Sequence, residues 1–437
     1  MIKLIISFNA IMFSLIAFFG SKENIQPKAI SNMPMCSTMQ EDGINPWTGN
    51  VLFSKFKSIE TTPSVFETDT SKGYTMPLLT QMPKGDVMLT WTEKDAQGVT
   101  SFCLAFSKDK GKTFSDKQVI YAGKGVGNSS LMRAKILVKK DGSLVAVFSN
   151  RTDAPQPVAN GSKGKRSLDI VFCMSKDNGA TWTSPQSVDA DPTKGNVKGF
   201  FDAVLMSNDE IAVAYLKDVA NSTKHEERDL RLVTTKNGVF QPERVIDPVV
   251  CDCCNINFLI DAKGALNIYY RDNNDDIRDI AKMTSTDNGA TFSKPQIVHN
   301  DGWKIAGCPH NGAVSSTHGK SALVAWYSGS ETETGIRLVT QEGKKLFVLN
   351  DQSVKNPCLM GGSNQSIMLW EQNGGSDKTQ LVFRKIDGEK VSETLSVEGS
   401  VNATNSTGLV LGNQMLIAHE VKQDNKKNSL KISTMAL

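Results

Sequence analysis

The residues best suited to chemistry gather between Cys251 and Gly312. This segment opens with the sequence CDCC, runs through YYRDNNDDIRD and closes on GCPHNG. It holds four of the eight cysteines, two Arg-Asp pairs and two of the five histidines. Thiols, imidazoles and carboxylates are the side chains that bind metal ions, form disulfides or act on ligands. We therefore take this segment as the candidate site and the rest of the chain as the scaffold that positions it.

Two interpretations compete for the cysteines near His310. Thiolate clusters bind cations, but C-x-C-C lacks the two-residue gap with which two thiolates grip one structural zinc ion. In an exported protein the cysteines meet an oxidising environment, which favours disulfides over thiols. We predict two disulfides and no metal, with the pairing left open because four cysteines allow three connectivities. The cysteines concerned are Cys251, Cys253, Cys254 and Cys308.

An acidic loop with two arginines follows the cysteines. Calcium prefers carboxylate and carbonyl oxygens, but the spacing here is not that of an EF-hand loop. The charges either pair within the loop or form a cluster that grips an anionic or hydroxyl-rich ligand. We predict no cofactor, and calcium or another metal is the alternative. The loop residues are Arg271, Asp272, Asp275, Asp276, Arg278 and Asp279.

The N-terminus has the pattern of a secretory signal peptide. Lys3 precedes an apolar run over residues 4–19, and the small residues Gly20 and Ser21 follow it. The run is short for a bilayer span, which needs about 20 apolar residues. We predict a signal peptide over residues 1–20, an irregular lead over 21–49, and a mature chain that is secreted, periplasmic or on the cell surface without a membrane span. A net charge of +3 without a long basic run indicates no nucleic-acid partner.

The rest of the chain repeats with a period of about 55 residues, a pattern typical of stacked structural units. Three copies of Ser-x-Asp-x-Gly-x-Thr-aromatic begin at Ser107, Ser175 and Ser285. Asp-x-Gly favours a tight turn in which glycine takes left-handed angles and aspartate bonds back to the turn amides. We expect the aromatic residue to pack between neighbouring sheets. Very apolar second strands recur seven times, beginning at Asp86, Ser143, Glu210, Ala265, Ser321, Ser366 and Gln414.

These repeats predict an all-β fold: a single β-propeller of four-stranded antiparallel blades over residues 50–437. Seven blades are favoured, and six are the alternative if the last repeat is not a full blade. The last repeat has only three strands before Leu437, while an unpaired strand over residues 51–60 precedes the first. We predict that this N-terminal strand pairs with the C-terminal strand near residues 430–435 and closes the ring, which removes exposed edges.

The Asp-x-Gly turns, known as Asp-boxes, and the four-strand repeats resemble the sialidase superfamily, also called BNR-repeat proteins, over roughly residues 50–437. The combination of CDCC, YRD, RDI and CPHNG is similar to a group of secreted bacterial proteins labelled sialidase-like, a label that guarantees no activity. The resemblance implies an active site with three carboxylate-binding arginines, a tyrosine nucleophile paired with glutamate, and an aspartate as acid/base.

The sialidase pattern is incomplete in this chain. Thr75 stands where the first arginine belongs, although Pro77 is kept, and a threonine cannot bind a carboxylate through two parallel bonds. The nearest candidate for the acid/base is Asp95, in a polar loop that we expect to be exposed. Tyr269 and Tyr270 lie in an apolar strand and suit the core better than a nucleophile's role. We therefore assign no catalytic residue.

The predicted function is binding of a carbohydrate or a cell-surface protein at the channel mouth of a secreted, sialidase-like propeller. The alternative is a glycoside hydrolase, exo-sialidase-like, with a divergent active site. In a propeller the inner strand of each blade starts at the channel mouth, so residues near these starts should converge. The ligand-binding candidates are Arg133, Asp202, Asn257, Arg271, Asp272, Arg278, Asp279, His310, Asn311 and Glu371.

Overall fold

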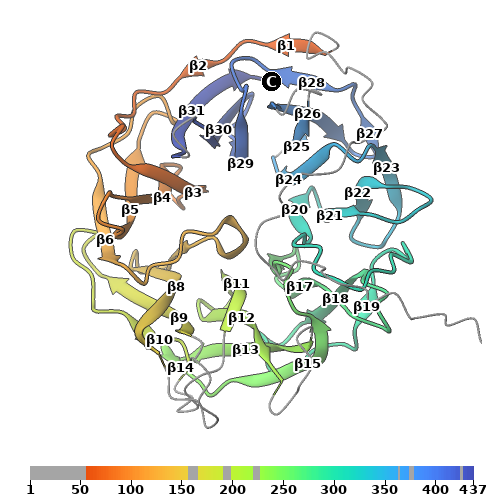
Figure 1. Cartoon of the computed structure of the whole chain (residues 1–437), viewed down its shortest axis with the longest axis horizontal. Coiled ribbons are helices and arrows are strands. Elements are labelled where there is room, and N and C mark those ends of the chain that lie inside the picture. The colour runs from red at the N-terminus through yellow and green to blue at the C-terminus, as the bar shows by residue number, and fades with distance from the viewer. Residues whose placement is uncertain are drawn as a thin grey trace, which may run out of the picture. The chain divides into compact units, whose positions relative to one another are not determined.

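Seven β-sheets stand around a central channel in the computed structural model (Figure 1). The structure describes residues 56–155, 166–189, 198–219, 227–362, 365–373, 378–423 and 427–437. The predicted signal peptide and lead segment lie outside the described residues. Within the described ranges the one helical turn is η2 (Ser130–Met132), and no helix has the length and apolar character needed to cross a membrane. The prediction of an all-β propeller with seven blades is confirmed.

Blades one to four follow one another along the chain, each with its inner strand first. Blade three has β15 as its outer strand and the short β14 as an additional partner of β13. The strands are β3 (Gly73–Gln81), β4 (Val87–Lys94), β5 (Thr100–Ser107) and β6 (Gln118–Gly123); β7 (Lys135–Val138), β8 (Leu144–Pro155), β9 (Arg166–Ser175) and β10 (Gln186–Ser187); β11 (Lys198–Leu205), β12 (Ile211–Asp218), β13 (Glu227–Lys236), β14 (Val239–Phe240) and β15 (Arg244–Cys251); β16 (Asn257–Ile260), β17 (Leu266–Arg271), β18 (Ile280–Ser285) and β19 (Gln296–Ile297).

Blades five to seven repeat the same arrangement. In blade six both β27 and β28 pair with β26. The strands are β20 (Val314–His318), β21 (Ser321–Ser328), β22 (Gly335–Thr340) and β23 (Lys345–Asn350); β24 (Val354–Met360), β25 (Ser366–Asn373), β26 (Thr379–Asp387), β27 (Lys390–Val391) and β28 (Leu395–Val397); β29 (Ala403–Val410), β30 (Gln414–Val421) and β31 (Ser429–Ala436).

Two short N-terminal strands join the last two blades on the rim of the ring (Figure 1). Strand β2 (Thr62–Pro63) pairs antiparallel with β31 and completes blade seven. Strand β1 (Lys57–Ile59) instead pairs parallel with β28 of blade six. Closure by the N-terminal segment is therefore confirmed, but the residues that pair with the C-terminal strand lie just after the predicted range 51–60. The chain runs along blade six up to Ile59, so only the residues beyond it reach blade seven.

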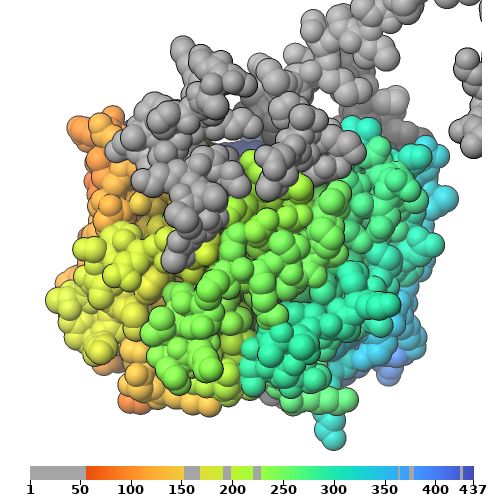
Figure 2. Space-filling view, turned by 90° about the horizontal axis from the view of Figure 1, so that it is seen from below, coloured from red at the N-terminus to blue at the C-terminus, as the bar shows by residue number. Residues whose placement is uncertain are grey.

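The second strand of each blade is apolar because neighbouring blades cover both of its faces. Every residue of β17 is buried, and seven of the eight residues of β4 are buried. A hydrophobic cluster fills each interface between successive blades, including the interface between blades seven and one. Figure 2 shows the rim of blades two to five as a continuous surface, on which blades that follow one another in the chain lie side by side.

The three Asp-boxes adopt the predicted turn. In the second, the Asp177 carboxylate accepts hydrogen bonds from Ser175 Oγ (2.8 Å) and from the Thr181 amide (2.9 Å). Gly179 has a φ of 88°, in the left-handed region. The aromatic residue that ends the motif, Trp182, packs against the cluster between blades one and two, as expected. Asp109 and Asp287 make the equivalent bonds.

These hydrogen bonds predict an acid-sensitive contribution to stability. Bonds from Thr181 hold the pKa of Asp177 at about 2, below the ordinary value of about 3.9. Because the folded state favours the carboxylate, Asp177 stabilises the fold above about pH 4, and this contribution disappears as the pH falls toward 2. We expect Asp177→Asn to lower stability to urea at pH 7 and to flatten the loss of stability between pH 4 and pH 2. Asp116→Asn, at an exposed position on the same kind of loop, should leave both quantities unchanged; equal curves for all three proteins would contradict the prediction.

Candidate functional site

A cavity of about 340 Å³ lies at the mouth of the channel, where the inner strands of the blades begin. All seven blades or their entry loops contribute to its wall. Five asparagines line it, one or more from each of blades four to seven: Asn255, Asn257, Asn311, Asn356 and Asn405. The wall also contains an arginine, a lysine, an aspartate and a histidine: Arg133, Lys135, Asp202 and His310.

A left-handed residue marks the start of the inner strand in five blades. The φ angles of these residues lie between 49° and 56°. In blades one, three, six and seven the pairing with the second strand shifts at this point, which is the signature of a β-bulge. The bulge turns the chain as it enters the blade and so fixes which groups face the mouth. The residues are Met76, Phe200, His310, Asn356 and Asn405.

Buried carboxyl groups bond to residues at three of these bulges. Glu371, on β25, accepts hydrogen bonds from Asn356 Nδ2 (2.9 Å) and from the Asn405 amide (2.6 Å) of the next blade. Glu420, on β30, accepts a bond from the Met76 amide (3.0 Å) of blade one. Burial raises the pKa of both carboxyl groups above its ordinary value. The predicted candidate Glu371 therefore lies behind the pocket wall and positions two of its asparagines.

Arg133 reaches the pocket from the loop that contains η2. Its Nη2 donates a hydrogen bond to the carbonyl oxygen of Asn405 (3.2 Å), on the other side of the ring closure. Lys135, two residues on, forms an ion pair with Asp202 of blade three. Asp202 also accepts a bond from the Phe258 amide (2.8 Å) of blade four. The candidates Arg133 and Asp202 thus lie in the pocket wall, each already bonded to another blade.

The acidic loop places its arginines inside the protein. Arg271 is 1% exposed, and its guanidinium donates to the carbonyl oxygens of Asn311 (2.9 and 2.7 Å), Tyr327 (2.9 Å) and Arg278. Arg278 is fully buried and donates to the carbonyl oxygen of Ile305 (3.1 Å). The pocket wall includes neither arginine. They join blade four to blade five beneath the mouth.

The aspartates of this loop also bond to the protein itself. Asp279 is buried and accepts bonds from the amides of Gly302 (3.0 Å) and Trp303 (3.2 Å). Asp272 is half-buried and accepts bonds from the Asn273 amide and from Asn274 Nδ2, both at 2.8 Å. Neither lines the pocket, whereas Asn257, His310 and Asn311 do.

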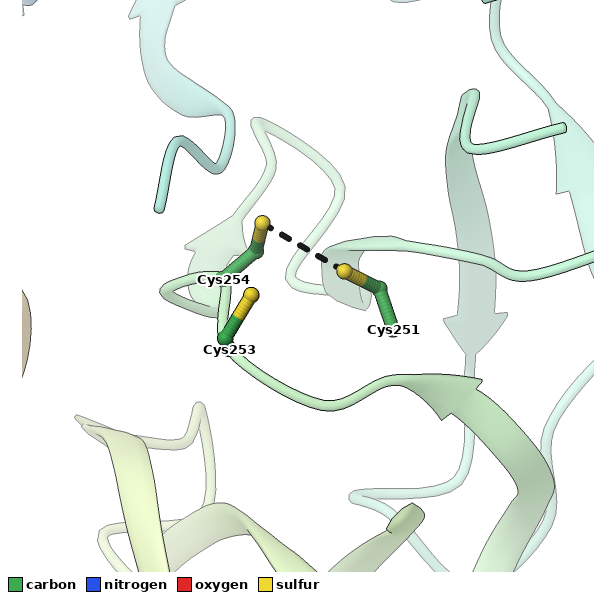
Figure 3. A group of neighbouring side chains, drawn as sticks. All are labelled: Cys251, Cys253 and Cys254. Atoms are coloured by element: carbon green, nitrogen blue, oxygen red, sulfur yellow. Dashed lines mark hydrogen bonds between the residues drawn. The ribbon is translucent and has the colours of Figure 1, made fainter. Parts of the chain in front are cut away.

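The four clustered cysteines meet between blades four and five, beside the pocket. Figure 3 shows the sulfurs of Cys251, Cys253 and Cys254 turned toward one another, with 3.5 Å between those of Cys251 and Cys254. Cys308 approaches from the following loop and lies 3.6 Å from Asp252 Oδ1. Hydrogen bonds from the Cys253 and Cys254 thiols hold the pKa of Cys251 below the ordinary thiol value. No disulfide joins the cysteines of the described residues, and the two disulfides stay a prediction.

The positions that correspond to sialidase catalytic residues have structural roles. Thr75 Oγ1 lies 2.7 Å from Thr92 Oγ1 within blade one. Asp95 accepts a bond from the Val99 amide (2.8 Å) and closes the turn between β4 and β5. Tyr269 and Tyr270 are buried in the core, as expected. These four residues therefore do not form a sialidase active site.

The fold and the pocket define a seven-bladed propeller with a ligand-sized cavity at its channel mouth. The family described as the BNR repeat-like domain matches residues 154–372, half of the chain, and the protein belongs to this family. No curated protein matches the chain.

Solved structures share the fold at low sequence identity. A protein of unknown function from Dyadobacter fermentans has a TM-score of 0.51 and 13% identity, over 87% of this chain and 99% of its own. A sialidase from Trypanosoma rangeli has a TM-score of 0.48 and 15% identity over 87% of this chain. This chain spans 58% of the length of that sialidase. A polysaccharide lyase, an ulvan lyase, has a TM-score of 0.49 and 11% identity, over 86% of this chain and 96% of its own.

Proposed function

We propose that the protein is an exported recognition module that binds a carbohydrate in the channel-mouth pocket. The observation that carries this proposal is the set of five asparagines around a cavity of about 340 Å³. A primary amide offers two donor hydrogens and an acceptor oxygen. Such groups match sugar hydroxyls, which both donate and accept. The cavity volume falls within the usual range for small-molecule sites, about 300–1,000 Å³.

Internal hydrogen bonds orient these amides before a ligand arrives. Asn255 Oδ1 accepts a bond from the Gly312 amide (2.8 Å), and Asn257 Oδ1 accepts one from Ser315 Oγ. Asn356 is held by Glu371. An amide that is fixed by one bond keeps its other donors and acceptors for the ligand and loses little side-chain freedom on binding.

The distribution of carboxyl groups favours binding over glycoside hydrolysis. Glycosidases flank the scissile bond with two carboxyl groups. Among the described residues of the pocket wall, Asp202 is the single carboxylate, and it is paired with Lys135. Glu371 and Glu420 are buried and hold bulge amides, so their hydrogen-bonding capacity serves the fold.

Substitution of Asn311 tests the proposal. Its side chain lines the pocket, while its backbone carbonyl receives the Arg271 bonds, so Asn311→Ala removes the amide group and keeps that contact. Glycans should be screened on an array with the full chain, and affinity for the best binder measured by calorimetry. We expect about tenfold weaker binding by Asn311→Ala, the value of one to two lost hydrogen bonds.

Asn350→Ala, at an exposed position on the outer strand β23 of blade five, is the matched control and should bind like the wild type. Sialosides and other glycans should be assayed for turnover in parallel. Cleavage that depends on Asp202 would replace the proposal with the hydrolase alternative. A glycan array without any binder would also contradict it.

A further inference from the structure

The cysteine cluster offers soft ligands to a metal ion at two overlapping positions. The sulfurs of Cys251, Cys253 and Cys254 all lie within 4.8 Å of one another. The ligand atoms of Cys253, Cys308 and His310 form a second group within the same limit, so Cys253 belongs to both. We propose that these five side chains form a thiolate-rich site for a soft d¹⁰ cation, Zn²⁺ or Cu⁺. This inference is independent of carbohydrate binding.

The spacing of the sulfurs suits coordination. Two thiolates on one zinc ion, each about 2.3 Å from the metal at a tetrahedral angle, lie about 3.8 Å apart. The Cys251 and Cys254 sulfurs are 3.5 Å apart, close to that separation. The C-x-C-C sequence achieves this because residues 252–253 form a turn between β15 and β16, which brings three thiols of four consecutive residues to one point. Sulfur and imidazole donors select Zn²⁺ and Cu⁺ over hard cations.

N–H groups surround the sulfurs as they do in thiolate metal sites. Arg278 Nη1 donates to Cys251 Sγ (3.3 Å), and the Asn311 amide donates to Cys254 Sγ (3.4 Å). Bonds from such donors orient metal ligands and stabilise their charge. The Arg278 guanidinium is itself fixed by its bond to the Ile305 carbonyl.

The buried charges around the cluster also fit a bound cation. Three thiolates around Zn²⁺ or Cu⁺ carry a net negative charge, which a protein interior tolerates only beside positive groups. Arg278 contacts the cluster directly. Arg271 lies beside it and makes its hydrogen bonds to carbonyl oxygens. Arg278 also lies 3.5 Å from Asp276 and 3.9 Å from Asp252, so its charge is shared with these carboxylates. Arg271, whose hydrogen bonds go to neutral carbonyl oxygens, therefore supplies the second positive charge near the cluster.

The site would lie at the edge of the pocket. His310 lines the cavity, while Cys251, Cys253 and Cys254 are buried. The group of Cys253, Cys308 and His310 thus meets the cavity through His310 and offers three protein ligands, the number that leaves a fourth position open in catalytic zinc sites.

Oxidation of the same cysteines is the competing state. Neighbouring Cα atoms are about 3.8 Å apart, which is shorter than the about 4.4 Å minimum of ordinary disulfides, so Cys253 and Cys254 do not pair with each other. The proximities in the structure then give the pairs Cys251–Cys254 and Cys253–Cys308. Peptide mapping without reduction distinguishes these disulfides from a metal site.

The full chain, purified without added metal and kept reduced with a non-thiol phosphine, should be titrated separately with Zn²⁺ and with Cu⁺ against chromophoric chelators. Co²⁺ should be added as a spectroscopic probe, because thiolate ligands give it an intense near-ultraviolet charge-transfer band. We expect at least one tightly bound ion per chain, the cobalt band, and affinity more than about 100-fold weaker in Cys251→Ser and Cys308→Ser. Cys173→Ser, which removes a buried thiol in blade two, should bind like the wild type.

The cobalt spectrum of the wild type keeps the test decisive even where a variant fails to fold. Absence of the band and of tight Zn²⁺ or Cu⁺ binding would overturn the proposal. Recovery of both predicted disulfides from the protein as secreted would overturn it as well. Metal found in the secreted protein at one or two equivalents, lost in Cys308→Ser and kept in Cys173→Ser, would establish the site.

Discussion

Replacing Arg271 by leucine is expected to lower the free energy of unfolding by about 3–5 kcal/mol, because the change leaves buried polar groups without partners. The guanidinium satisfies carbonyl oxygens of Asn311, Tyr327 and Arg278 and packs over the Trp303 ring at 4.9 Å. Leucine fills part of the volume but donates no hydrogen bond. Urea denaturation at neutral pH measures the effect.

Arg151→Leu is the matched control for this prediction. Arg151 is exposed on blade two, and surface substitutions usually stay within about 0.5 kcal/mol of the wild type. A loss of less than about 1 kcal/mol in Arg271→Leu would show that these carbonyls find other partners. The structure also explains why a change at Arg271 is a poor test of ligand binding: it acts through the joint between blades four and five.

Asp301→Ala is expected to cost a similar amount, about 3–5 kcal/mol, because it leaves a buried arginine unpaired. The Asp301 carboxylate is fully buried and lies 2.5 Å from Arg337 Nε. It also accepts a bond from Trp326 Nε1 (2.7 Å) and lies 3.0 Å from His299 Nδ1. Three groups, one from the outer loop of blade four and two from the strands of blade five, therefore depend on one carboxylate.

Glu331→Ala, at an exposed position of the same blade, should change stability by less than about 0.5 kcal/mol. The double variant Asp301→Ala with Arg337→Leu separates the two contributions to the effect. If the unpaired charge causes the loss, removing Arg337 as well should restore part of the stability. A double variant that is less stable than the wild type by the full sum of the two single losses would contradict this explanation.

The architecture could be predicted because its signals are local and repeated. Asp177 and Gly179 specify a turn with their own side chain and backbone angles, and the same residues recur in two other blades. The apolar second strands identify the layer that is buried on both faces. Ring closure was predicted less well, because the pairing of Thr62 with Thr434 joins opposite ends of the chain. No local pattern fixes which residues of an N-terminal strand reach a distant partner.

Only part of the candidate site could be predicted, again because contacts between distant parts of the chain leave no local pattern. The position of a residue at the start of an inner strand is visible in the sequence, which is how Asn257, Asn311 and Arg133 were placed at the mouth. Burial is decided by three-dimensional neighbours. The arginines of the acidic loop have the composition of a ligand cluster, yet Arg271 and Arg278 find carbonyl oxygens in the next blade. These partners are backbone carbonyl oxygens, which no residue type in the sequence reveals, whereas the ion pair of Arg278 with Asp276 (3.5 Å) lies within the loop itself.

The pocket asparagines that the sequence analysis missed carry a weak but real signal. Asn255 and Asn405 each stand at the entry to an inner strand, as the predicted residues do. Aligning the seven inner strands with one another would have shown asparagine recurring at these entries. Asn405 also lies in the left-handed region, which asparagine adopts more readily than most residues.

At these left-handed positions, the backbone conformation of the mouth does not depend on which side chain stands there. Each bulge holds the chain in a conformation that costs a residue other than glycine about 1–3 kcal/mol, so the surrounding sheet, not the residue, imposes it. Met76 and Phe200 pack into the core at this position, whereas His310, Asn356 and Asn405 line the cavity. Blades five to seven therefore each present one position to the cavity, on a backbone frame that five blades share. A change of ligand could be acquired blade by blade, through substitutions at the mouth that leave the interfaces between blades intact.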